Sequence, residues 1–202
     1  MRNIVILIFC VLSSLFANEA VDKLMKDKAC VGCDLSGADL RGIKAQGFVL
    51  DNANLSLATL NKGDFSGASF IKTNVSDAEA IGIILDGAII YTSNWSGTNL
   101  KNARFVGADA KGMSLENANL ENADMSSGRL WAVNFQGANL KNVTMKEAQL
   151  GQANMTGVDL RYTNLEGAIF WETKLHGAKL LKKDCEAAKK DGAIMDGSTQ
   201  CL

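Results

Sequence analysis

The chain has 202 residues, enough for a single domain with a buried core. Its 21 Lys and Arg residues nearly balance its 22 Asp and Glu residues, and the formal net charge is −1. This balance argues against a nucleic-acid binder, which usually carries a basic excess, and against an acidic surface that imitates DNA. The sequence holds one His, so it offers few groups for acid–base catalysis or metal binding. We therefore expect no enzyme activity, no metal site and no cofactor.

Residues 1–17 have the pattern of a secretory signal peptide. Arg2 supplies a positive start, the run from Ile4 to Leu12 is apolar throughout, and Ala17 offers a small residue for cleavage. The apolar run is too short for a membrane-spanning helix, which needs about 20 residues. We expect a periplasmic or secreted protein with no stable membrane insertion after cleavage, and a retained N-terminal anchor is the alternative.

Residues 18–32 are expected to form a helical cap. The stretch from Glu19 to Ala29 places Val21, Leu24 and Met25 between charged residues in a short amphipathic pattern. Such a pattern predicts a helix that covers apolar surface with one side.

A repeat of five residues governs residues 33–182. Every fifth residue from Leu35 to Leu180 is apolar, and we call these thirty positions the centres. Two residues before a centre, Ala fills fifteen of the thirty positions, and two residues after it Gly is commonest. Neither the helix period of 3.6 nor the strand period of 2 produces a repeat of five. A short fixed period is typical of a stacked solenoid, and Gly and Asn suit its tight turns.

The repeat resembles the pentapeptide-repeat family, whose unit reads A(D/N)LXX. Matches include Ala38-Asp39-Leu40, Ala53-Asn54-Leu55, Ala118-Asn119-Leu120 and Ala138-Asn139-Leu140, and the resemblance covers about 150 residues. It implies an all-β fold, a right-handed quadrilateral parallel β-helix with four pentapeptides per coil, in which the centre and the residue two before it point inward. Thirty units then make seven and a half coils, or a rod about 36 Å long at about 4.8 Å per coil.

Residues 183–202 are expected to form a second cap. The stretch from Leu181 to Lys190 is rich in Lys, Glu and Ala and predicts a helix, and residues 193–197 return to the phase of the repeat. Such short helical caps would cover coil ends that otherwise expose unpaired backbone, whereas an uncovered end favours end-to-end dimers.

Four cysteines remain after the predicted cleavage, namely Cys30, Cys33, Cys185 and Cys201. An even number suggests disulfides in an oxidising compartment. In the implied rod the ends are about 36 Å apart, and a disulfide tolerates a Cα separation of only about 4.4–6.8 Å. The feasible pairs within one chain are then Cys30–Cys33 and Cys185–Cys201. Free thiols and a redox-active Cys-x-x-Cys remain as alternatives.

Four pentapeptides per coil place residues twenty apart on the same face of the rod. One face is a neutral polar ladder that includes Asn54, Asn74 and Asn94, and another mixes charges of both signs. The face with centres Leu50, Phe70, Ile90, Ala110, Leu130, Leu150 and Phe170 differs, because its outward residues include Val49, Ile71, Ile89, Tyr91, Trp131, Ile169 and Trp171.

Outward apolar side chains gathered on one face suggest a contact surface. We predict that Ile71, Tyr91, Trp131 and Trp171 bind a partner, with Trp131 and Trp171 about 10 Å apart and Tyr91 in line with them. The alternative is that these side chains only pack on their neighbours or on a terminal helix.

Three classes of function compete. The first is a noncatalytic exported scaffold that presents its aromatic face to an unknown protein or glycan in the cell envelope, with no nucleic acid as partner. The second follows from the resemblance, because some pentapeptide-repeat proteins imitate DNA and protect gyrase in the cytoplasm. The signal peptide and the interspersed Lys and Arg residues oppose it. The third is an enzyme, and no catalytic motif in the sequence supports it. We favour the first.

Overall fold

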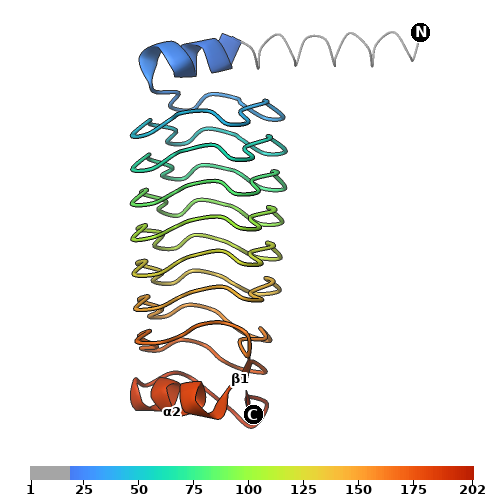
Figure 1. Cartoon of the computed structure of the whole chain (residues 1–202), viewed down its shortest axis with the longest axis vertical. Coiled ribbons are helices and arrows are strands. Elements are labelled where there is room, and N and C mark those ends of the chain that lie inside the picture. The colour runs from blue at the N-terminus through green and yellow to red at the C-terminus, as the bar shows by residue number, and fades with distance from the viewer. Residues whose placement is uncertain (1–18) are drawn as a thin grey trace, which may run out of the picture.

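The computed structural model of the chain describes residues 19–202, so the predicted signal peptide lies outside the described residues. The described chain winds into a rod of stacked coils with a helix over each end (Figure 1). The N-terminal helix covers residues 19–27. At the other end, strand β1 (Lys179–Leu180) leads into helix α2 (Lys182–Lys190), and strand β2 (Gln200–Cys201) follows. Neither helix is long and apolar enough to cross a membrane within this part of the chain.

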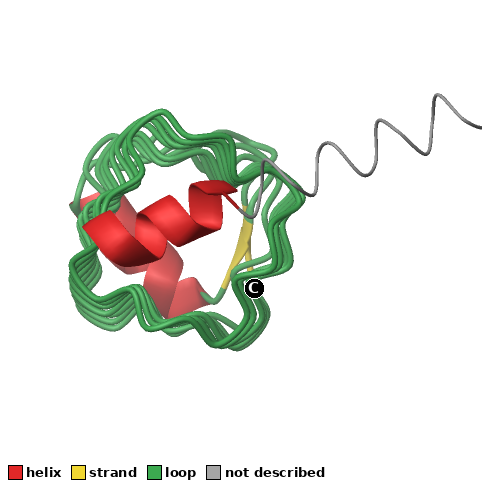
Figure 2. Cartoon of the chain, turned by 90° about the horizontal axis from the view of Figure 1, so that it is seen from above, coloured by secondary structure: helices red, strands yellow, loops and turns green. Residues whose placement is uncertain are grey.

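Neighbouring coils are joined by parallel pairing of residues twenty apart. Asn54 pairs with Asn74 and Asn74 with Asn94, and the backbone N–H of Leu50 donates to the carbonyl of Ser69 over 2.8 Å. Twenty residues are four pentapeptides, and the coils superimpose on a four-sided outline when seen along the axis (Figure 2). The fold is a right-handed quadrilateral parallel β-helix, which confirms the prediction.

The corners of the coils depend on a left-handed residue two positions after each centre. Gly97 has φ of 69° and Asn117 has φ of 58°, and the same sign recurs at this position from Gly32 to Gly177 with one exception. Glycine adopts such angles freely and Asn tolerates them, which explains their frequency here. The exception is Tyr162, whose carbonyl accepts a hydrogen bond from the N–H of Asn142 over 3.0 Å. That corner therefore turns differently from the others.

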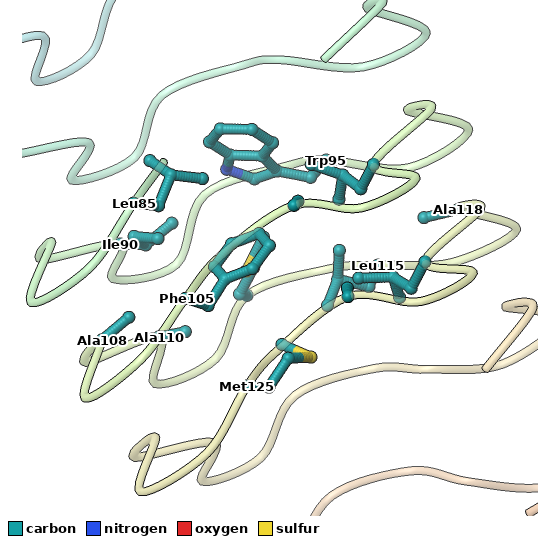
Figure 3. Packing of buried hydrophobic residues seen from close by; sticks show 14 of the residues in the cluster. Leu85, Ile90, Trp95, Phe105, Ala108, Ala110, Leu115, Ala118 and Met125 are labelled. Atoms are coloured by element: carbon teal, nitrogen blue, oxygen red, sulfur yellow. The ribbon is translucent and has the colours of Figure 1, made fainter. Parts of the chain in front are cut away.

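The centres form the interior of the rod, as predicted. All thirty are buried, and the most exposed of them, Leu165, reaches only 5%. Trp95 and Phe105 lie edge-on with ring centroids 6.4 Å apart, packed among aliphatic centres such as Leu85 and Ile90 (Figure 3). Each fully buried Leu or Phe contributes about 1.5–3 kcal/mol, so this column of side chains stabilises the whole rod.

Several positions two before a centre hold a buried threonine, and its hydroxyl has a fixed partner. Thr73 donates to the carbonyl of Leu50 over 2.8 Å, and Thr98 donates in the same way to Val75. In both cases the acceptor lies 23 residues earlier, in the preceding coil. Because a buried hydroxyl without a partner is costly, this repeated bond explains how Thr replaces Ala inside the rod.

The two ends are closed by helices and by one partial coil. Leu24 of the N-terminal helix is fully buried against the first coil, and Cys185 and Ala188 of α2 are buried against the last one. After α2, Ile194 pairs with Lys174, so residues 193–197 do return to the repeat. Strand β2 then pairs in parallel with β1, and the N–H of Lys182 donates to the carbonyl of Leu202 over 2.7 Å.

Candidate binding surface

The candidate surface is the face with centres Leu50 to Phe170, which we call the aromatic face. Its outward apolar side chains are exposed at Ile89 (39%), Ile169 (47%) and Trp171 (44%). The side chains of Val49, Ile71, Tyr91 and Trp131 on the same face are half-buried. The residues predicted as a site therefore all lie on the surface of one side, although they differ in exposure.

Trp131 and Trp171 are closer together than their spacing in the sequence predicts. Their ring centroids are 5.6 Å apart with planes tilted by 48°, rather than about 10 Å apart. The reason is Gly151, which lies in the coil between them. A Cβ atom at this position would come within 2.6 Å of the Trp131 ring, so the missing side chain lets the indole lie over the Gly151 backbone. The expected distance was wrong because it ignored this gap.

Hydrogen bonds hold two of the aromatic side chains in place. The indole N–H of Trp131 donates to Oε1 of Gln149 over 3.0 Å. The hydroxyl of Tyr91 donates to Oδ2 of Asp109 over 2.8 Å, and this bond raises the pKa of the Tyr91 hydroxyl above its ordinary value. Arg129 lies 3.4 Å from the same carboxylate. These rings are oriented before any partner arrives.

The line of aromatic residues is interrupted. Lys111 occupies the coil between Tyr91 and Trp131, so ring-to-ring contact on this face is restricted to the Trp131–Trp171 pair within residues 19–202. The effects of Gly151, Gln149 and Lys111 on this surface were not predicted from the sequence. A glycine directly after a centre was the available signal, because on this face only Gly151 occupies that position.

The polar ladder face behaves differently, since its groups bond to each other. The side-chain amide of Asn74 donates to Oδ1 of Asn54 over 3.1 Å, and Asn94 donates in the same way to Asn74. The Oδ1 of Asn54 also accepts the N–H of Ser56 over 3.2 Å. This face confirms the predicted ladder, and its amides already have partners within the rod.

The mixed-charge face is neutralised by local ion pairs. Lys101 and Glu121 lie 2.9 Å apart, and the guanidinium of Arg161 lies 2.6 Å from the carboxylate of Asp159. The hydrogen bond from Arg161 holds the pKa of Asp159 below its ordinary value, and the same arrangement recurs between Arg41 and Asp39. Three acidic groups of this face, Asp39, Glu121 and Asp159, are therefore matched by cations, which is unlike a surface that imitates DNA.

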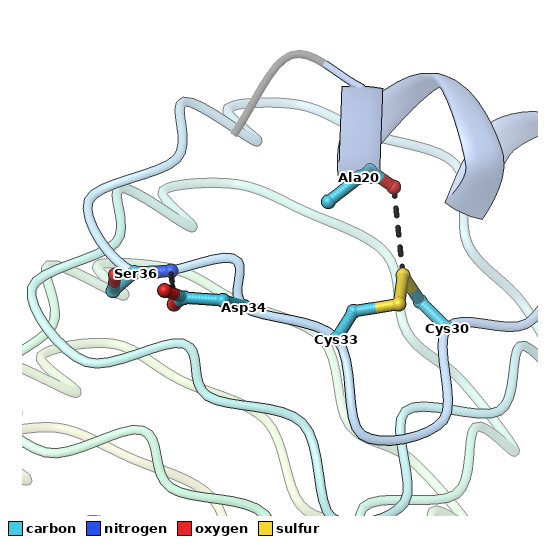
Figure 4. The surroundings of a disulfide bond; sticks show 5 residues. All are labelled: Ala20, Cys30, Cys33, Asp34 and Ser36. Carbon is cyan, nitrogen blue, oxygen red and sulfur yellow. Dashed lines mark hydrogen bonds between the residues drawn. A yellow bond between two sulfur atoms is a disulfide. The ribbon is translucent and has the colours of Figure 1, made fainter. Parts of the chain in front are cut away.

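Both predicted cysteine pairs are joined in the structure. Cys30 and Cys33 form a disulfide with Cα atoms 5.3 Å apart, and Cys185 and Cys201 form another with Cα atoms 5.8 Å apart. The first lies under the N-terminal helix, where Sγ of Cys30 is 3.5 Å from the carbonyl oxygen of Ala20 (Figure 4). A disulfide sulfur carries no proton, so this is a packing contact. The second ties α2 to β2.

His176 is partly exposed on the last full coil, and its Nδ1 lies 2.9 Å from Oδ2 of Asp196. The pair joins the last coil to the C-terminal segment. Across residues 19–202, no group of three or more His, Cys, Asp or Glu side chains is placed to hold a metal ion.

Two family models match the repeats. The model described as "Pentapeptide repeat region" matches residues 84–155, and the model described as "Pentapeptide repeats (8 copies)" matches residues 33–71, 50–87 and 153–184. Together the matches extend across the coils and into α2. No curated protein sequence matches the chain.

Solved structures similar to this chain include QnrB1, a plasmid-mediated fluoroquinolone resistance protein, with 18% identity over 84% of this chain and 82% of that chain and a TM-score of 0.48. HetL from Nostoc sp. strain PCC 7120, involved in heterocyst differentiation regulation, has 24% identity over 85% of this chain and 87% of its own, with a TM-score of 0.37. A protein from the Arabidopsis thaliana thylakoid lumen has 25% identity over 52% of this chain and 72% of its own, with a TM-score of 0.38.

Proposed function

The chain belongs to the pentapeptide-repeat family, and we propose that it is a noncatalytic exported scaffold whose aromatic face binds a protein or glycan partner. The observation that carries this proposal is the Trp131–Trp171 pair, which is held over Gly151 and fixed by Gln149 while Trp171 stays 44% exposed. Aromatic side chains that are oriented in advance lose little conformational entropy on binding, and they are enriched at binding hot spots.

Export is supported by the cysteines and by the N-terminal sequence. Both disulfides lie in the caps, and structural disulfides persist in oxidising compartments such as the periplasm. The pattern of residues 1–17 is that of a signal peptide. Fractionation of cells that express the full chain should place the protein in the periplasm or the medium, with both disulfides intact. A cytoplasmic protein with four free thiols would contradict export.

Gyrase protection by imitation of DNA is the alternative, and the surface charges oppose it. Such a surface needs an excess of acidic groups, whereas here Lys101 neutralises Glu121 and Arg161 neutralises Asp159. Arg104 likewise lies 2.7 Å from Asp86 on a third face, whose centres run from Ala45 to Leu165. If the purified protein relieved inhibition of gyrase by a fluoroquinolone, the alternative would replace the scaffold proposal.

The binding proposal is tested with the double variant Trp131→Ala, Trp171→Ala. Capture of partners from envelope extract and binding to a glycan array are measured with parent and variant. We expect the variant to keep its thermal unfolding transition near that of the parent and to lose at least about tenfold in affinity, because a hot-spot truncation costs about 2 kcal/mol or more. The matched control is Leu57→Ala, Tyr162→Ala, which removes two exposed apolar side chains from other faces. Full capture by a folded Trp variant would show that the partner binds elsewhere.

A further inference from the structure

The aromatic face carries two columns of outward side chains. The first column holds the residues directly before each centre, namely Ser69, Ile89, Asp109, Arg129, Gln149 and Ile169. The second column holds the residues directly after each centre, namely Ile71, Tyr91, Lys111, Trp131, Gly151 and Trp171. Parallel pairing of Ile89 with Asp109 and of Asp109 with Arg129 keeps the coils in register, so the two columns run side by side along the rod.

In four of the six coils the two columns are chemically complementary. Ile89 stands beside Tyr91, and Ile169 stands beside Trp171, so both of these rows are apolar. Asp109 stands beside Lys111, a pair of opposite charge. Arg129 stands beside Trp131, and a guanidinium placed over an indole is attracted by the ring.

A two-fold axis parallel to the rod converts this pattern into a self-complementary surface. If two copies face each other across such an axis, each coil meets the same coil of the other copy, and the columns are exchanged. Ile169 then faces Trp171 of the second copy, and Ile89 faces Tyr91. Asp109 faces Lys111. We propose that the partner of the aromatic face is a second copy of this chain, bound side by side with the two rods parallel. This inference rests on the proposed function and names its partner.

Lys111 is the second observation that favours this occupant. Its side chain is exposed in the middle of the face, and no carboxylate in residues 19–202 lies within ion-pair distance of it. Asp109 is held nearby by Tyr91 and by Arg129 at 3.4 Å. A second copy would supply a carboxylate to each Lys111, and opposite charges placed this way also select the register of the two surfaces.

Antiparallel rods fit less well. In that arrangement each column faces itself, and Asp109 meets Arg129 of the second copy in only one register. That register also places Lys111 opposite Trp131 of the second copy, which conflicts with the need of Lys111 for a carboxylate partner. Parallel rods avoid the conflict and align every coil. The two helices lie over the ends of the rod (Figure 2), so its sides are the surfaces left for lateral contact.

The dimer is expected to be weak. The coils from Ile71 to Trp171 span only about 24 Å at about 4.8 Å per coil. A contact of this length and of one face in width falls below the area of about 1,200 Å² that stable interfaces bury. Association should therefore be measured by sedimentation velocity on the processed chain with its disulfides, from micromolar to millimolar concentration.

The test uses two charge reversals, Asp109→Lys and Lys111→Asp, each checked for folding by circular dichroism. Each variant alone places like charges opposite each other, and we expect its dimer dissociation constant to rise at least about tenfold. In an equal mixture, a chain that carries Asp109→Lys meets a chain that carries Lys111→Asp with opposite charges restored, so heterodimers should form with nearly the parental constant. Because the rescue needs both chains, it separates contact between copies from any effect within one chain.

The matched control mixes the Asp109→Lys chain with an Arg129→Asp chain. In this mixture, heterodimers with opposite charges restored could form only between antiparallel rods. Rescue there, or no rescue in the first mixture, overturns the proposal. A parent chain that stays monomeric at millimolar concentration also overturns it. Suppose that the monomeric parent binds an envelope protein or a glycan and that this binding is lost when Trp131 and Trp171 are replaced by Ala. The proposed function then stands, and only a second copy is excluded as the partner. If the Trp variant neither dimerises less than the parent nor binds a protein or glycan less tightly, the proposed function is contradicted as well.

Discussion

The inside and the outside of this rod follow different rules. Inside, every centre from Leu35 to Leu180 is apolar and buried, and all thirty belong to one hydrophobic cluster. Outside, the four faces share one backbone but differ in chemistry, from the bonded Asn ladder to the exposed Trp171. The difference shows that the interior and the left-handed corners hold the fold, which leaves the outward positions free to vary with function.

The largest expected difference in stability is between substitutions of two adjacent residues, Leu130 inside the rod and Trp131 outside it. Leu130→Asp places an unpaired carboxylate in a fully buried column, and we expect a loss of more than about 4 kcal/mol, enough to unfold the neighbouring coils. Trp131→Ala should cost about 1 kcal/mol, because the ring is only half-buried over Gly151. Urea unfolding measures both. Similar losses of unfolding free energy for the two variants would contradict the distinction between inside and outside.

The two disulfides test how much the ends of the rod depend on crosslinks in addition to the buried interior. Cys185→Ala with Cys201→Ala opens a loop of fifteen intervening residues, and the entropy of the unfolded chain then favours unfolding by about 3 kcal/mol. The same change at Cys30 and Cys33 opens a much shorter loop and should cost less.

Hydrogen exchange locates the loss at each end. Without the Cys185–Cys201 bond, amides of α2 and β2 should exchange faster while the central coils keep their protection. Uniform loss of protection along the rod would mean that the caps and the coils unfold as one unit.

Gly151 occupies an outward position of the repeat but is buried under the Trp131 ring, so its replacement should change stability. Gly151→Ala would bring a Cβ atom within 2.6 Å of the Trp131 ring, so the indole must move, at a cost of about 1 kcal/mol. The backbone at Gly151 is not left-handed, so the change tests crowding alone. Tryptophan fluorescence should report the loss of the Trp131–Trp171 contact. Ser56→Ala, the corresponding place on the polar ladder face, is the control and should leave the emission spectrum unchanged.

The smallest effect concerns a carboxylate that is buried at the cap. Burial raises the pKa of Asp184 above its ordinary value of 3.8, while Lys183 acts in the opposite direction. The folded chain therefore holds this proton more tightly than the unfolded chain does. Its contribution to stability is fully present below about pH 3.8 and is lost as the pH rises through the raised pKa.

Asp184→Asn removes that dependence. The free energy of unfolding of the variant, relative to the parent, should increase as the pH rises from 3.8 through the raised pKa of Asp184. Thermal unfolding at several pH values measures it, and Glu186→Gln, an exposed change on the same helix, is the control. A relative stability of Asp184→Asn that falls with pH would have the wrong sign for a buried carboxylate.

Most of the fold could be predicted from the sequence because one physical requirement repeats thirty times. An apolar centre every five residues and a Gly or Asn two residues later specify the interior and the corners. The helix expected over residues 181–190 is observed as α2, Lys182–Lys190. The corner at Tyr162 could not be predicted, since other bulky residues such as Leu57 do adopt the left-handed angle at the same position.

The candidate surface was predicted less completely. The period of five, together with the four pentapeptides per coil that the family resemblance implies, determined which face each outward residue occupies, because side chains twenty apart then stack. It placed Tyr91, Trp131 and Trp171 in one column. How far each side chain leans along that column depends on the room left by its neighbours and on the hydrogen bonds it finds. Only the tertiary structure decided that Trp131 lies over Gly151, bonds to Gln149 and contacts Trp171, because these contacts join residues eighteen to forty positions apart.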